Sequence, residues 1–128
     1  MLDKNKFTNH KMHHHQDDGF TLTELIVVLA ILGVLAAIAI PTFTNILDGA
    51  NRTADNSNKN IVESAVETYR AVNGNLPAVS SQSGNAAFNE LVKKLHDEGY
   101  LKNETIVPEQ KGKQFLYDPS SGKVSISE

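Results

Sequence analysis

The sequence predicts an α+β chain in which one long N-terminal helix packs against a small head made of a second helix and antiparallel strands. Three observations predict this arrangement. Residues 25–40 contain no polar side chain, residues 42–73 repeat apolar side chains at helical spacing, and residues 85–127 combine an amphipathic helix with alternating strand patterns. The chain of 128 residues has room for one domain.

The composition excludes several classes of protein. The chain has no cysteine, so a disulfide framework, an iron–sulfur cluster, a thiolate zinc site and a cysteine nucleophile are excluded. Its 12 basic and 15 acidic side chains give a net charge of −3, which indicates no general attraction to nucleic acid. No phosphate-binding loop, dinucleotide-binding glycine pattern, zinc-protease motif or nucleophile elbow is present. We therefore predict that the chain is not an enzyme and has no cofactor and no metal site.

The first predicted element is a membrane-spanning helix. Residues 20–40 contain one charged side chain, Glu24, and as a helix they would rise about 31 Å, close to the thickness of the bilayer interior. Two alternatives are the apolar core of a secretory signal peptide and a buried core helix of a soluble protein. Residues 25–40 are slightly long for the first, and the residues after position 40 are too polar to cover the second.

The charged residues on either side of this segment set its orientation. Lys4, Lys6 and Lys11 precede it, and the first positive charge after it is Arg52. The positive-inside rule then predicts a single pass with the N-terminus in the cytoplasm and the rest of the chain outside.

Glu24 is the one ionisable residue in the apolar segment. An acidic side chain costs about 2.5–3.5 kcal/mol at the centre of a membrane helix and less near its end. Such a residue indicates a functional site with a cationic partner. The alternative is that Glu24 reaches the lipid headgroups at the cytoplasmic end and has no further role.

The stretch Gly19-Phe20-Thr21-Leu22-Thr23-Glu24-Leu25, followed at once by the apolar run, resembles the N-terminus of type IV prepilins and pseudopilins. The resemblance implies that residues 1–19 are a leader that a prepilin peptidase removes by cutting between Gly19 and Phe20. It also implies N-methylation of Phe20 and a pilin-like fold. Removal of 19 of the 128 residues would leave a mature chain of 109.

The resemblance also implies an assembly site. Cleavage would create a cationic amine at Phe20, with an ordinary pKa of about 8. In the family, the glutamate at the position of Glu24 pairs with that amine on a neighbouring subunit, so neither charge is left bare in the membrane interior. Gly33 and Pro41 lie where family members carry residues that weaken or kink the helix.

The implied function is that of a structural subunit of a type IV pilus or pseudopilus. Its partners would be further copies of identical or related pilins, the prepilin peptidase, an assembly ATPase and membrane platform proteins. The chain would lie in the cytoplasmic membrane before assembly and in a cell-surface filament afterwards. Motility, adhesion, secretion and DNA uptake remain open, and DNA is a partner only of a competence pilus. The alternative is a single-span, membrane-anchored binding module that never polymerises.

The pattern divides the mature chain into three parts, namely residues 20–41 for membrane and assembly, 42–73 for the outer half of the long helix, and 74–128 for the head. The apolar stripe of the outer half is Phe43, Ile46, Leu47, Ala50, Ala54, Ile61, Ala65, Tyr69 and Val72. Asn73-Gly74 and Pro77 predict its end. Residues 48–60 are rich in Asn and Gly, so they predict either a locally weak helix or a flexible linker.

The head begins with a loop at residues 74–84. Phe88, Leu91, Val92 and Leu95 form one face of a helix over residues 85–98, and Gly99 ends it so that Tyr100 and Leu101 fold back. Residues 114–117 and 123–127 predict a hairpin around a turn at 118–122, and residues 105–107 predict a third strand. The basic residues Lys111, Lys113 and Lys123 near Phe115 and Tyr117 suggest either a nucleic-acid contact or a solvated surface.

Overall fold

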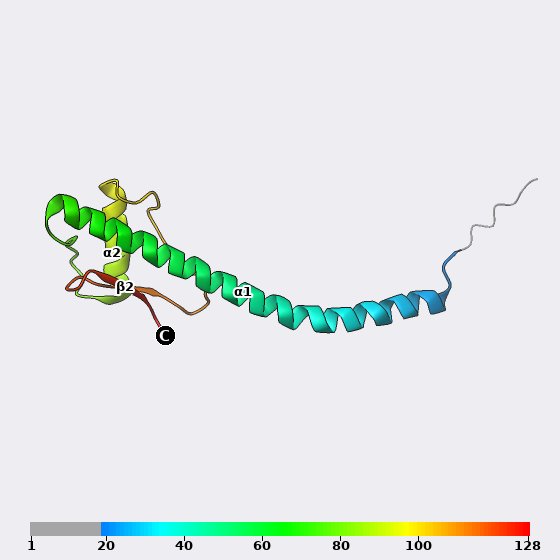
Figure 1. Ribbon diagram of the computed structural model, residues 1–128. Helices are drawn as coiled ribbons and strands as arrows, with labels where there is room; N and C mark the ends of the chain where they lie inside the picture. Colours follow the sequence, from blue (N-terminus) through cyan, green and yellow to red (C-terminus); the bar gives the residue numbers. More distant parts are fainter. Residues whose placement is uncertain (1–18) are drawn as a thin grey trace, which may run out of the picture. The chain divides into compact units, whose positions relative to one another are not determined.

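The structure is a computed structural model and describes residues 19–128. The element order is α1 (Leu22–Asn73), α2 (Gly84–Asp97), β1 (Phe115–Asp118) and β2 (Lys123–Ile126). The described residues fall into two compact units, one ending at Ile38 and the other running from Ala39 to Glu128. This arrangement confirms the predicted fold class, a long apolar helix followed by a small helix-and-hairpin head (Figure 1).

Helix α1 ends where its sequence predicts. Asn73 is its last residue, and Gly74 follows with a φ of +80°, a value that favours glycine. The Gly74 N–H donates to the carbonyl oxygen of Arg70 at 2.8 Å, which satisfies one of the last free carbonyls of the helix. Pro77 lies just beyond and is fully buried.

The Asn- and Gly-rich stretch at residues 48–60 is helical throughout. The flexible-linker alternative for this stretch is therefore wrong. Its low helix propensity is offset by tertiary contacts. Asp55 on this stretch is fully buried, and it bonds to a segment more than 50 residues further along the chain.

Helix α2 supplies the largest share of the core. Its buried side chains include the predicted face and one alanine, namely Ala87, Phe88, Leu91, Val92 and Leu95. Gly99 has a φ of +83°, and the N–H groups of Tyr100 and Leu101 both donate to the carbonyl oxygen of Leu95, at 2.7 and 3.1 Å. The chain therefore folds back after α2 as expected, and Leu101 is buried.

Strands β1 and β2 form an antiparallel hairpin in which Phe115 pairs with Ile126 and Tyr117 with Val124. Phe115, Tyr117 and Val124 are buried, so one face of the hairpin packs on the core. The Phe115 ring stacks on Phe88 of α2 with centroids 5.0 Å apart. Figure 1 shows the hairpin and α2 beside the C-terminal part of α1.

The predicted stripe on the outer half of α1 is correct only in part. Val62 and Val66 are fully buried and Ala65 nearly so, whereas Ile61 and Val72 are 51% and 69% exposed. Phe43, Ile46 and Leu47 are also exposed. The head packs on the face of α1 that carries residues 62, 65, 66 and 69, because that face meets α2 and the hairpin in one core.

Residues 105–107 do not form the predicted third strand. Ile106 is buried, but Val107 points outward and is 64% exposed. Pro108 follows and has no N–H to give to a strand ladder. The next two N–H groups, of Glu109 and Gln110, donate to the Asp55 side chain instead of to a strand.

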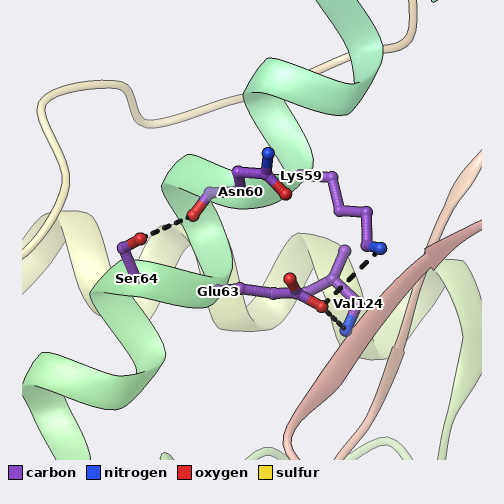
Figure 2. A network of polar contacts seen from close by, with 5 residues as sticks. All are labelled: Lys59, Asn60, Glu63, Ser64 and Val124. Carbon is purple, nitrogen blue, oxygen red and sulfur yellow. Dashed lines mark hydrogen bonds and ion pairs between the residues drawn. The ribbon is translucent and has the colours of Figure 1, made fainter.

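Glu63 of α1 lies against the free edge of β2, as Figure 2 shows. Its Oε1 accepts a hydrogen bond from the Val124 N–H at 3.3 Å and lies 4.0 Å from the Lys59 ammonium. At the next position on α1, the Ser64 hydroxyl donates to the Asn60 carbonyl oxygen one turn back. The Glu63 carboxylate therefore accepts a hydrogen bond from an N–H group at the edge of β2. That N–H could otherwise donate to a strand of another chain.

Candidate functional site

The residues predicted for processing lie immediately before α1. Gly19, Phe20 and Thr21 are in non-helical backbone, and the Phe20 side chain is 92% exposed. A Cβ placed on Gly19 would meet nothing within 4 Å. The peptide bond between Gly19 and Phe20 is therefore accessible in the described part of the chain.

Glu24 and Thr21 form a reciprocal pair at the start of α1. The Thr21 N–H donates to Oε2 of Glu24 at 2.8 Å, and the Glu24 N–H donates to the Thr21 hydroxyl at 3.2 Å. This is a capping box, in which two free N–H groups of a helix N-terminus are satisfied by side chains. The Glu24 carboxylate is thus held at the end of the helix, one turn from the Phe20 backbone.

The sequence analysis missed the role of Thr21 in this pair. The signal was present, since Thr21-Leu22-Thr23-Glu24 before an apolar run is the capping-box pattern. The structure joins Glu24 to Thr21 within one chain. The amine of Phe20 exists only after cleavage, so its pairing with Glu24 stays a prediction.

The apolar part of α1 has no cover from the described chain. Its larger side chains between Leu25 and Ile40 are each 49–66% exposed, and a Cβ on Gly33 would meet nothing within 4 Å. The helix is long and apolar enough to cross a membrane, with a mean hydropathy of 2.8 over its most apolar window. Such a surface requires lipid or other helices around it.

Gly33 and Pro41 both lie inside continuous helix. Beyond Pro41 the Thr44 hydroxyl donates to the Pro41 carbonyl oxygen at 2.9 Å, a side-chain hydrogen bond back to the preceding turn of the helix. Their predicted role in helix flexibility remains a prediction.

Asp55 is a second polar site, and the sequence analysis did not find it. Its side chain is fully buried and accepts three hydrogen bonds, from the Glu109 N–H at 2.7 Å, the Gln110 N–H at 3.2 Å and the Gln110 side-chain amide at 2.8 Å. Burial alone would raise the pKa of Asp55, but these three hydrogen bonds outweigh burial and lower the pKa below its ordinary value. The carboxylate is therefore ionised and fixes residues 109–110 to α1.

The basic residues of the head do not form a nucleic-acid site with the nearby aromatic rings. Phe115 and Tyr117 are buried in the core and cannot stack on bases. No group of three or more His, Asp or Glu side chains within residues 19–128 is arranged to hold a metal ion. The histidines at positions 10–15 and the rest of the predicted leader before Gly19 lie outside the described residues.

Known proteins resemble both the N-terminal segment and nearly the whole length of this chain. A family model described as the prokaryotic N-terminal methylation motif matches residues 15–40. The type II secretion system core protein G of Pseudomonas aeruginosa is 32% identical over 121 residues, which cover 90% of this chain and 84% of that protein. No solved structure matches the chain.

Two further relatives are proteins of Clostridium perfringens and Thermus thermophilus. The prepilin peptidase-dependent protein A of Clostridium perfringens is 29% identical over 119 residues, covering 85% of this chain and 83% of that protein. The type IV narrow pilus major component PilA5 of Thermus thermophilus is 45% identical over 47 residues, covering 37% of this chain and 40% of that protein. With the methylation motif at its start and relatives along nearly its whole length, the chain belongs to the type IV pilin and pseudopilin family.

Proposed function

We propose that this chain is a structural subunit of an extracellular filament of the type IV pilus or pseudopilus class, and that it polymerises through its N-terminal apolar helix. The uncovered surface of residues 25–40 is the observation that carries the proposal. That surface suits lipid before assembly and the same helices of neighbouring copies afterwards. The relatives support a structural rather than an enzymatic role, because one is a core protein of a type II secretion system and another is a major component of a type IV pilus.

Processing comes first in the proposed sequence of events. The leader holds Lys4, Lys6 and Lys11 in the cytoplasm, and residues 20–41 span the cytoplasmic membrane once. A prepilin peptidase cuts between Gly19 and Phe20 and methylates the new amine. The methylation motif at residues 15–40 and the accessible backbone at Gly19 and Phe20 support this step.

Assembly then uses two charges at the new N-terminus. The Glu24 carboxylate of an incoming subunit would exchange the Thr21 N–H for the Phe20 amine of a subunit already in the filament. An opposite charge in a low-dielectric surrounding is a stronger partner than a neutral N–H. An assembly ATPase and membrane platform proteins would supply energy and direction. DNA would be a partner only in a competence pilus, and the relatives named here include both secretion and pilus proteins.

The first experiment is intact-mass analysis and N-terminal sequencing of protein sheared from the cell surface. We expect filaments built from a chain that starts at N-methylated Phe20. A chain that keeps residues 1–19 and stays in the membrane fraction would instead support the anchored, non-polymerising module.

Glu24→Gln is the second experiment, because it keeps the size of the side chain and removes its charge. Breaking a buried charge pair costs about 3–5 kcal/mol, enough to reduce assembly by more than about a hundredfold. Asp97→Asn, an exposed change on α2, is the matched control and should leave sheared filament unchanged. Normal filament yield from Glu24→Gln would remove Glu24 from the assembly site.

A further inference from the structure

A groove lies between α1 and the segment that leads into β1. It has a volume of about 480 Å³, and the side chains that matter here are Leu47, Asp48, Arg52, Glu109, Lys111 and Lys113. We call these six residues the basic groove. All of them belong to the unit that begins at Ala39. The hydrogen bonds from Glu109 and Gln110 to Asp55 fix the lysine-bearing segment against the helix.

The groove gathers positive charge on an acidic protein. It holds three cations, Arg52, Lys111 and Lys113, against two carboxylates, so its net charge is +1 while the whole chain carries −3. Among residues 19–128 none of these three cations forms an ion pair with a carboxylate; the two ion pairs there involve Lys59 and Arg70. The cations are therefore available to an external anion.

The position of the groove along α1 places it at a membrane surface. Apolar side chains continue past Pro41, with Phe43 64% and Leu47 47% exposed, and Asp48 is the first charged residue after them. Leu47 lies seven residues beyond Ile40, which is about 10 Å along a helix. The headgroup layer of one leaflet is about 5–7 Å thick.

Leu47 is thus about 3–5 Å beyond the headgroup layer, a distance that a lysine side chain can span, and Lys111 and Lys113 line the same groove as Leu47. Lysine and arginine side chains at this depth extend their charged ends to lipid phosphates while their stems stay on apolar surface. The groove therefore combines one apolar side chain, Leu47, with three cations, and such cations suit a contact with anionic headgroups.

We propose that, before assembly, the basic groove docks on anionic lipid headgroups of the outer leaflet and holds the head against the membrane. The proposal rests on the membrane-inserted stage of the proposed function. Each cation near an anionic surface contributes roughly fivefold to binding. Lys111→Gln with Lys113→Gln changes the groove from +1 to −1, since one cation then faces two carboxylates.

The test uses the full chain in vesicles with a fluorescent label on a single cysteine. The chain has no cysteine, so Gln114→Cys gives one label beside the groove, and Ala86→Cys on α2 gives a reference position. Energy transfer to a headgroup acceptor is measured in phosphatidylcholine vesicles with and without phosphatidylglycerol. We expect stronger transfer from position 114 when phosphatidylglycerol is present, and loss of that increase in 0.5 M salt.

The double variant Lys111→Gln, Lys113→Gln should lose this increase, because its apparent affinity for the anionic lipid falls roughly twenty-five-fold. Lys93→Gln with Lys102→Gln removes the same charge from exposed positions elsewhere and should keep it. Circular dichroism of each variant checks folding. An increase that survives in the groove variant, or that disappears equally in both variants, would overturn the proposal.

Energy transfer that depends on the protein-to-lipid ratio but not on lipid charge would identify a second copy of the chain as the occupant of the basic groove. This result would also overturn the proposal. The assay needs neither cleavage nor filaments. Failure here therefore leaves the filament function standing, and failure to form filaments leaves the docking measurement unaffected.

Discussion

The carboxylate of Asp55 and the backbone N–H of Glu109 are joined by a 2.7 Å hydrogen bond between positions 54 residues apart. Together with the two bonds from Gln110, it makes one side chain of α1 the anchor for the segment between α2 and β1. This segment forms no strand, so its N–H groups at Glu109 and Gln110 bond to the Asp55 side chain instead of to a neighbouring strand. The basic groove depends on it, because the same segment carries Lys111 and Lys113.

Asp55→Ala should therefore destabilise the head. It leaves three partly buried donors without an acceptor, and each costs less than the roughly 1–3 kcal/mol of a fully buried donor. Thermal unfolding of the full chain in detergent, followed by circular dichroism, measures the effect. Asp48→Ala is the matched control, since Asp48 is exposed on the same helix, and it should change the midpoint little. Equal losses in the two variants would contradict the anchor.

The sequence could predict the elements that depend on local signals. Asn73-Gly74 ends α1, and the Gly99 stop brings Leu101 back to the core, as expected. The Asp55 anchor could not be predicted from the sequence, because its partners are more than 50 residues away. Two of these partners are backbone N–H groups, which every residue except proline carries.

The buried face of α1 could not be fixed from the sequence either. Ile61-Val62 and Ala65-Val66 are adjacent apolar pairs, and neighbouring positions on a helix differ by about 100° in direction. Two faces were therefore compatible with the pattern, and only packing against α2 and the hairpin selects the face of Val62 and Val66. The predicted partner of Glu24, the Phe20 amine, lies on another subunit, so the packing of a single chain does not select it.

The stability of the head should fall in acid through Asp118. Hydrogen bonds from the hydroxyls of Ser120 and Ser121, aided by the Ser120 N–H, lower the pKa of Asp118 from 3.8 to about 2. A lowered pKa in the folded state means that the stabilisation is complete above about pH 4 and is lost as the pH falls toward 2. The hydrogen bonds that lower the pKa of Asp55 act in the same direction.

Unfolding midpoints measured from pH 5 to pH 2 check this pH dependence. Asp118→Asn should be less stable at pH 5 and should lose less stability on acidification than the native chain. Parallel curves for the two proteins would show that Asp118 does not carry the dependence.

Gly122 should tolerate alanine less well than Gly112. Both have positive φ, +72° and +75°, so each alanine costs about 1–2 kcal/mol in backbone strain. A Cβ on Gly122 would also lie 2.6 Å from a Leu76 methyl carbon, whereas one on Gly112 meets nothing within 4 Å. Unfolding of Gly122→Ala and Gly112→Ala compares the two costs directly.

The additional loss at Gly122 should shrink when Leu76 is also changed to alanine, because the methyl group that clashes is then gone. An unchanged difference between the two glycines in the Leu76→Ala background would assign the effect to backbone conformation alone.

Tyr117→Phe should leave the free energy of unfolding unchanged or raise it. The Tyr117 hydroxyl is buried and has no hydrogen-bond partner among residues 19–128, and burial, with a smaller effect of the Asp118 charge, raises its pKa. Removing a buried polar atom that makes no bond relieves its desolvation cost. Tyr100→Phe is the matched comparison, because that hydroxyl accepts a hydrogen bond from the Asn73 amide at 3.1 Å and its loss should cost about 0.5–1.5 kcal/mol. If Tyr117→Phe were the more damaging of the two, the hydroxyl would have to bond a buried water, and the core around β1 would contain a polar site.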